Sequence, residues 1–134
     1  MNLIDCEKSS IILMAQGTHI VFCYYNISEM TIKRFEKLYG KNSWKDSVPV
    51  LKVFKVNEKN SEELETIYMD PLADNWYINL KEDGIKVLVE LGRVLPNNEF
   101  ISLAISNQVI TARNNPSDNS KIRYVNVFDN KVKQ

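Results

Sequence analysis

Tyr77 and Asn79, in the segment "DNWYINL" (74–80), have the side chains best suited to contacting a ligand. If this segment is a strand, residues two apart share a face, so the ring and the amide would lie side by side. A tyrosine ring can stack on a sugar or a base, and an amide can hydrogen-bond to its edge. The alternative use of Tyr77 is packing against its cross-strand neighbours. Trp76 would point to the opposite face, where it is expected to pack in the core.

Other aromatic and charged residues also suit binding. Trp44 follows a predicted helix in a polar loop, where it either covers the core or contacts a partner. Tyr24 and Tyr25 are adjacent in a predicted strand, so one should face inward and the other outward. Arg113 can hold a carboxylate or a phosphate through its planar guanidinium. Its alternative partners within the chain are Asp70, Asp74 and Asp118. The predicted binding residues are therefore Tyr77, Asn79, Trp44, Tyr25 and Arg113.

The sequence contains no recognisable catalytic constellation. His19 is the only histidine, and with Cys6 and Cys23 it does not give the ligand spacing of a zinc site. No nucleophile elbow, P-loop or dinucleotide-binding glycine motif occurs. A pair of catalytic carboxylates needs a fixed separation, which sequence alone does not reveal. We therefore predict a non-catalytic protein without metal or cofactor.

The charge balance argues against a general nucleic-acid binder. The 134 residues suit one domain, and 17 basic residues match 17 acidic ones, for a net charge of +0. A protein that neutralises many phosphates needs a surplus of basic residues. A nucleic-acid partner remains an alternative because of four basic residues near the C-terminus: Lys121, Arg123, Lys131 and Lys133.

The sequence predicts a cytoplasmic location. The first ten residues lack a basic stretch leading into an apolar run, so they do not resemble a signal peptide. No apolar run approaches the roughly 20 residues that cross a bilayer, so a membrane partner is not expected. Without export, Cys6 and Cys23 are expected to be free thiols in a reducing compartment.

Two strands are predicted near the N-terminus, at 11–15 and 20–27, joined by a short turn that contains Gly17. Their apolar residues do not alternate strictly with polar ones. This pattern favours strands that are covered on both faces.

One amphipathic helix is predicted at 29–39. Ser28 is a good N-cap, the apolar residues that follow have helical spacing, and Gly40 suits the C-terminal end. Residues 41–47, which include Trp44, are expected to form a polar loop.

Short strands separated by turn residues are predicted for the rest of the domain. The expected strands are 48–56, 64–69, 75–80, 85–91, 101–105 and 109–112. Val87, Val89 and Leu91 would share one face. This spacing is typical of a mainly β protein with an immunoglobulin-like antiparallel β-sandwich, here with one short helix across one end.

The predicted organisation has three parts: an N-terminal arm (1–10), the sandwich domain (11–118), and an edge strand or tail (119–134). Ser106 and Asn107 should separate two strands, with Asn107 hydrogen-bonded to its own backbone. The alternating segment "IRYVNVF" (122–128) suits an edge strand that adds to the sheet of a second copy, giving a homodimer.

Five segments of the chain resemble an uncharacterised bacterial domain family. They are "QGTHIVFCYYNIS" (16–28), "LKVFKV" (51–56), "DNWYINL" (74–80), "VELG" (89–92) and "SNQVITARNNPSD" (106–118). Family members typically read like "RDP–x–x–LFVYWEIS", "LRVYDV", "DNWYI", "VELG" and "SNxVxTPRxxPSD". The resemblance covers most of 11–118, and its specific parts are the Trp-Tyr pair and the last two segments.

The resemblance implies an immunoglobulin-type sandwich but no agreed function. Some relatives are joined to a Rho-type N-terminal module, and others lie near glucan-processing enzymes, so the two contexts imply different partners. The chain departs from the pattern at 16–18, where the family has Arg-Asp-Pro, at Tyr25 and Asn26, where it has Trp-Glu, and at Ala112, where it has Pro. If those positions carry the family's function, this copy has lost or changed it.

Together, these patterns predict a non-catalytic binding or protein-interaction module that recognises a protein or glycan partner through exposed aromatic residues. The alternative is a nucleic-acid-associated accessory protein.

Overall fold

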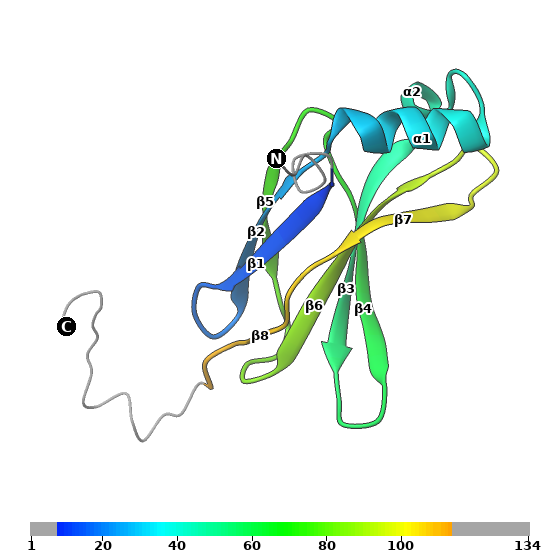
Figure 1. The fold of residues 1–134 in the computed structure, drawn as a ribbon. Coiled ribbons are helices and arrows are strands. Elements are labelled where there is room, and N and C mark those ends of the chain that lie inside the picture. The colour runs from blue at the N-terminus through cyan, green and yellow to red at the C-terminus, as the bar shows by residue number, and fades with distance from the viewer. Residues whose placement is uncertain (1–7, 114–134) are drawn as a thin grey trace.

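Two antiparallel sheets pack together in the computed structural model, which describes residues 8–113 (Figure 1). The first sheet has the order β1-β2-β5, with β1 at Ser10–Ala15, β2 at Ile20–Asn26 and β5 at Asn75–Asn79. The second sheet has the order β4-β3-β6-β7, with β4 at Ser61–Tyr68, β3 at Val48–Val56, β6 at Lys86–Val94 and β7 at Phe100–Ile105. The short strand β8, Val109–Ile110, also pairs with β6. The predicted mainly β, antiparallel sandwich is confirmed.

Part of the predicted organisation lies outside residues 8–113. Outside this range are most of the N-terminal arm, Cys6, Asp118, the segment 122–128 and the basic residues near the C-terminus. Among the residues that the structure describes, no helix is long and apolar enough to cross a membrane.

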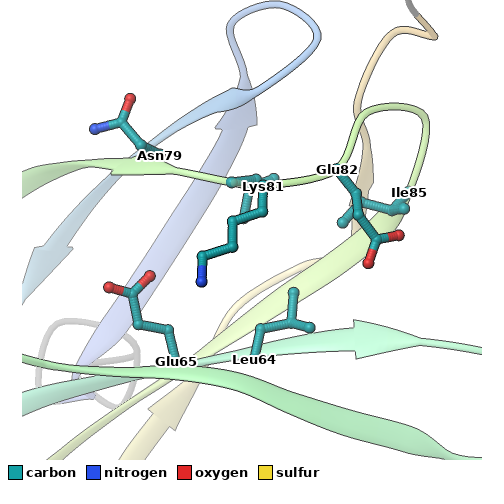
Figure 2. Close-up of a pocket in the computed structure, with 7 residues that line it drawn as sticks. Leu64, Glu65, Asn79, Lys81, Glu82 and Ile85 are labelled. Atoms are coloured by element: carbon teal, nitrogen blue, oxygen red, sulfur yellow. The ribbon is translucent and has the colours of Figure 1, made fainter.

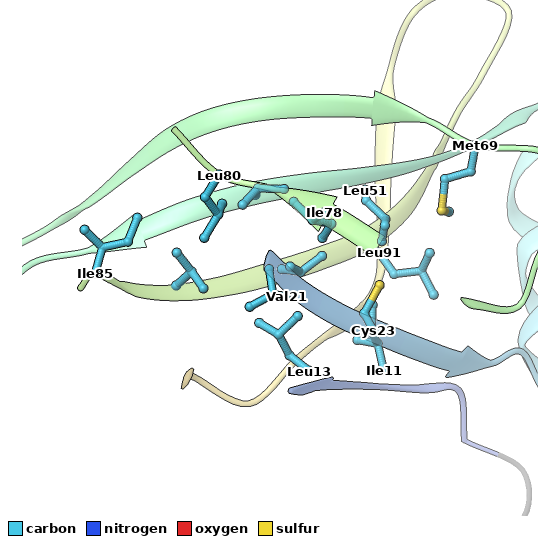
Figure 3. Packing of buried hydrophobic residues seen from close by; sticks show 13 residues of the cluster. Ile11, Leu13, Val21, Cys23, Leu51, Met69, Ile78, Leu80, Ile85 and Leu91 are labelled. Atoms are coloured by element: carbon cyan, nitrogen blue, oxygen red, sulfur yellow. The ribbon is translucent and has the colours of Figure 1, made fainter. Parts of the chain in front are cut away.

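The core lies between the two sheets (Figure 3). Val21 and Ile78 of the first sheet belong to the same buried cluster as Leu51 and Leu91 of the second, and each is at most 1% exposed. The predicted inward face of β6 is confirmed, because its three members are buried: Val87, Val89 and Leu91.

The predicted helix is confirmed with its boundaries. The helix α1 spans Glu29–Tyr39 and lies across one end of the sandwich (Figure 1). The Ser28 hydroxyl accepts a hydrogen bond from the Thr31 N–H at 3.1 Å, so it caps the first turn. At the other end, Gly40 has a φ of 121°, a conformation that residues with a Cβ rarely adopt.

The prediction of a polar loop throughout 41–47 is wrong, because this segment contains the helix α2, Ser43–Asp46. Short hydrogen bonds hold it at both ends: the Ser43 hydroxyl donates to the Gly40 carbonyl, and the Ser47 hydroxyl donates to the Trp44 carbonyl, each at 2.7 Å. A four-residue helix is too short to show the apolar periodicity by which helices are recognised in a sequence.

Two strands extend well beyond one of their predicted ends. β4 begins at Ser61, and β6 continues beyond Leu91 to Val94. Gly92 and Arg93 interrupt the apolar alternation of β6. The last three residues of the strand therefore cannot be recognised from the sequence pattern. The β6–β7 register also shifts between Leu91 and Gly92, as at a β-bulge.

The prediction that the first two strands are covered on both faces is wrong for the described part of the chain. One face of the first sheet packs on the core, whereas Ile12, Met14 and Ile20 on the other face are each 39% exposed. Burial alternates along β1 and β2 although polarity does not. The sandwich therefore presents apolar side chains to solvent on this sheet.

In the segment that links β7 to β8, the side chains of Ser106 and Asn107 form hydrogen bonds with backbone groups. The Ser106 hydroxyl accepts from the Val89 N–H at 2.9 Å and donates to the Asn107 carbonyl at 2.8 Å. The Asn107 side-chain amide accepts from the Leu13 N–H at 2.8 Å and donates to the Leu13 carbonyl at 3.0 Å. The predicted strand break is confirmed, but the expected bond of Asn107 to its own backbone is wrong, since the amide ties β1 to the second sheet.

Asn107→Ala should lower the free energy of unfolding by about 1–2 kcal/mol, because two hydrogen bonds to Leu13 are lost. Urea denaturation followed by circular dichroism measures this loss. Gln108→Ala is the matched control, since the exposed neighbour should change stability by less than about 0.5 kcal/mol. Equal losses in the two variants would contradict the bridging role of Asn107.

Cys23 is a free, buried thiol, as predicted. Burial raises its pKa to about 11. Because the thiolate is the reactive form, Cys23 is inert near neutral pH in the folded protein.

Candidate functional site

The exposed side of the first sheet gathers six apolar side chains on one surface, here called the apolar face. Its members are Ile12 and Met14 of β1, Ile20, Phe22 and Tyr24 of β2, and Tyr77 of β5. The strand register places Met14 opposite Phe22 and Phe22 opposite Tyr77. The Phe22 ring centroid lies 4.7 Å from that of Tyr77 and 6.3 Å from that of Tyr24. The exposed aromatics of this sheet therefore form one continuous patch.

The predicted residues Tyr77 and Asn79 lie on this side of the sheet. Tyr77 is 61% exposed, and Asn79 is exposed two residues along the same strand. Asn75 lies opposite Tyr24 in the register, so both ends of β5 add an amide to the border of the apolar face. The outward positions of β1, β2 and β5 hold no charged residue. Trp76 packs against the core and is half-buried, in agreement with the predicted alternation.

Asn79 also borders a hollow of about 310 Å³ between β4 and the turn after β5. Figure 2 shows Lys81 extending toward Glu65 of β4, while the Asn79 amide turns away from both. The Lys55 ammonium pairs with the Glu82 carboxylate at 2.9 Å, but the two side chains are 27% and 53% exposed, so solvent screens the pair and it contributes little. The polar side chains that line this hollow are exposed and offer a ligand no desolvated partner.

Trp44 is packed within the protein and lies outside the apolar face. Its ring contacts Phe35 of α1 edge-on, with 5.2 Å between centroids. On its face, the guanidinium carbon of Arg93 lies 4.0 Å from the ring centroid. Trp44 was predicted either to cover the core or to contact a partner, and this geometry favours the first role.

Arg93 is a site residue that the sequence analysis missed. It follows Val89 and Leu91 in the inward series of β6 and is only 8% exposed. Its Nε donates to the Ser47 hydroxyl at 2.6 Å, and its Nη2 donates to the carbonyls of Ser47 at 3.0 Å and of Trp44 at 3.1 Å. The sequence does contain a signal for this residue. Val87, Val89 and Leu91 are two residues apart and share the inward face, and Arg93 occupies the next position of that series, just after the predicted end of the strand.

Arg93, Trp44 and Tyr25 line a pocket of about 200 Å³ next to α1, here called the Arg93 pocket. The Tyr25 hydroxyl donates to the Ala73 carbonyl at 2.8 Å, and burial is the main cause that raises its pKa to about 12. Burial lowers the pKa of Arg93 to about 10, against the opposing effect of Tyr25. The structure therefore brings two of the predicted residues together around a buried cation.

Arg113 follows β8, which lies at the end of the sandwich away from α1 (Figure 1), and it belongs to neither the apolar face nor the Arg93 pocket. It is exposed and packs beside Gly84. Within residues 8–113 it makes no ion pair with either predicted partner, Asp70 or Asp74. The His19 ring forms a hydrogen bond with the hydroxyl of its neighbour Thr18, with 2.8 Å between Nδ1 and Oγ1.

A comparison with protein families matches residues 7–122 to a domain of unknown function, DUF4912. The match includes every residue of the apolar face and of the Arg93 pocket. No curated protein matches the chain.

Proposed function

The chain belongs to the DUF4912 family, and we propose that it is a non-catalytic binding module that recognises a protein partner through the apolar face. The observation that supports this proposal is the contiguity of six apolar side chains on one solvent-facing sheet surface without a charged residue. Soluble domains seldom expose large apolar patches, and those that do commonly use them to bind. The proposal includes the immunoglobulin-like type of sandwich and the cytoplasmic location expected from the sequence.

The composition of the apolar face favours a protein over a glycan. Half of its members are aliphatic: Ile12, Met14 and Ile20. The rings are not coplanar, because the Phe22 ring is tilted by 46° to that of Tyr77 and by 36° to that of Tyr24. A flat sugar chain gains most from coplanar rings, whereas an uneven aliphatic and aromatic surface suits the side chains of a helix or sheet.

A glycan is the second candidate, and the placement of Asn75 and Asn79 favours it. The Asn79 amide offers two donors and an acceptor at the border of the exposed rings of Tyr24 and Tyr77. The Asn75 amide donates one N–H to Asp74 and offers its oxygen and its other N–H there. Sugar hydroxyls require such groups. A nucleic-acid partner has less support, because the outward positions of the three strands carry no cation to neutralise phosphates.

Affinity capture with variants of the apolar face tests the proposal. Proteins captured from an extract of the source organism by the wild-type chain should fall at least about fivefold with Tyr77→Ala or Tyr24→Ala, as for an interface hot spot. Tyr68→Ala is the matched control and should capture normally, since Tyr68 is 63% exposed but lies on β4 of the other sheet. Quantitative mass spectrometry measures the captured proteins.

Two parallel measurements separate the candidate partners. A glycan array and a gel shift at two salt concentrations use the same variants, and the protein proposal expects no signal in either. Circular dichroism confirms that each variant is folded. Undiminished capture by a folded Tyr24→Ala, Tyr77→Ala double variant would reject the apolar face, and Tyr77-dependent glycan binding would replace a protein by a glycan.

A further inference from the structure

Arg93 is a buried cation without a counterion in the described part of the chain. It is 8% exposed and forms no salt bridge with any residue in 8–113. Asp70 and Asp74 are the acids of the neighbouring loop, but the Asp70 carboxylate accepts from the Leu72 N–H at 2.9 Å and that of Asp74 from the Asn75 amide at 2.8 Å. Burial of an unpaired charge is unfavourable, so such a site is suited to an anionic group.

The guanidinium still has hydrogen-bonding capacity to offer. Nε and Nη2 donate to Ser47 and Trp44, which fixes the guanidinium plane against α2. Neither N–H of Nη1 has an acceptor among residues 8–113. An arginine whose Nε and Nη2 are held in place and whose Nη1 has no acceptor in the described residues is preorganised to bind one.

The Arg93 pocket is small, and apart from Arg93, Tyr25 and Trp44 its lining residues are apolar. Side chains from both sheets and from α1 form its walls, among them Ile27, Ile32, Pro49, Leu91 and Leu103. Its volume of about 200 Å³ is below the range typical of sites for drug-sized ligands, so it suits one short functional group. Such walls bind a short hydrocarbon chain well and a second charge poorly.

We propose that the Arg93 pocket binds a carboxylate group carried on a short apolar chain, with one oxygen accepting from Nη1 of Arg93. A single fixed cation matches the single charge of a carboxylate, whereas a doubly charged phosphate would need further cations that the pocket lacks. The carboxylate belongs either to a free short-chain acid or to a side chain or C-terminus of a bound protein. This site is separate from the apolar face and does not depend on the function proposed for that face.

Nuclear magnetic resonance titration with sodium butyrate tests this inference. The Nε–H signal of Arg93, the indole N–H signal of Trp44 and the backbone amide of Gly92 should shift along one saturable curve, with a Kd of roughly 1 mM, as expected for one ionic contact and a short buried chain. Sodium chloride at equal ionic strength and neutral butyramide should not produce a saturable shift. A linear response, or one equal to that of chloride, overturns the proposal.

Variants separate pocket binding from general attraction. Arg93→Met should abolish saturation, and Ala73→Leu, which enlarges a lining side chain and keeps the cation, should weaken binding about tenfold or more. Arg113→Met is the matched control, because it removes an exposed arginine that does not line the pocket and should leave the Kd unchanged. If Arg93→Met does not fold, Ala73→Leu still decides the question. An unchanged Kd in Ala73→Leu, or a loss in Arg113→Met equal to that in the pocket variants, overturns the proposal.

Two acetylated tripeptides identify the source of the carboxylate. One ends in a free C-terminal carboxylate, and the other is amidated and carries a single glutamate. Binding by either peptide about tenfold tighter than by butyrate assigns the pocket to a protein partner. Butyrate binding without peptide binding assigns it to a free acid, and no binding by all three overturns the proposal.

Discussion

Replacing Leu51 with alanine should lower the free energy of unfolding by about 3 kcal/mol. Leu51 is 0% exposed in β3, paired with Ile67 of β4 on one side and Leu91 of β6 on the other. The three carbon groups removed lose roughly 0.8 kcal/mol of burial each, and the cavity left between the sheets adds the rest. Urea denaturation should show a lower midpoint at an unchanged slope, because the surface exposed on unfolding is almost the same.

Leu72→Ala is the matched control for this prediction. It makes the same chemical change at a leucine that is 93% exposed in the loop before β5, so stability should change by less than about 0.5 kcal/mol. Similar losses at the two positions would contradict the placement of Leu51 in the core.

Local signals made part of the fold predictable from the sequence. The bounds of α1 follow from Ser28 and Gly40, whose side chain and φ fix the two ends of the helix. β3 was predicted with its observed bounds because polar and charged loops flank a mostly apolar stretch that is rich in valine. Where local signals are weak, as in the four residues of α2, pattern analysis assigned a loop.

Long-range partners were not predictable. Asn107 looks like a turn residue in the sequence, yet its amide bonds to Leu13, which is 94 positions away. No periodicity indicates a side chain that substitutes for a neighbouring strand. The same residue type at the same kind of boundary commonly bonds to its own backbone, so composition alone could not distinguish the two roles.

The candidate surfaces were predictable to different degrees. Alternation along β5 placed Tyr77 on one face and Trp76 on the other without knowledge of the neighbouring strands. The apolar face was not predicted as a patch, because apolar residues on both faces of β1 and β2 suggested a covering layer. In the structure these side chains are exposed, and they form the surface proposed to bind a protein partner.

The Arg93 pocket was not predicted, because the C-terminal end of β6 was predicted incorrectly. The predicted strand stopped at Leu91 because Gly92 and a charged residue break the apolar pattern. In the structure, Gly92 and Arg93 remain in β6, and Arg93 continues the inward series. Trp44 and Tyr25 were predicted separately as binding residues, but the cation they surround was not, so the Arg93 pocket could be recognised only once both sheets were placed.

Gly92→Ala should lower the free energy of unfolding by about 3 kcal/mol, against the usual preference for alanine over glycine within a strand. A Cβ on Gly92 would lie inside the contact distance of the Ile101 carbonyl oxygen and of the Phe100 ring. The ring can rotate away, but the carbonyl belongs to the backbone of β7, which pairs with β6 at this point. The clash between the new Cβ and the Ile101 carbonyl can therefore be relieved only if the pairing of β6 with β7 breaks or shifts.

A double variant identifies which contact dominates. If the Ile101 carbonyl is decisive, Phe100→Ala combined with Gly92→Ala should not recover the stability of Phe100→Ala alone, as measured by urea denaturation. Ser102→Ala is the control for this region, because Ser102 lies opposite Gly92 in the register and is exposed, so it should change stability by less than about 0.5 kcal/mol. A stabilising effect of Gly92→Ala would show that ordinary strand propensity decides at this position and that β7 does not approach β6 as closely as described.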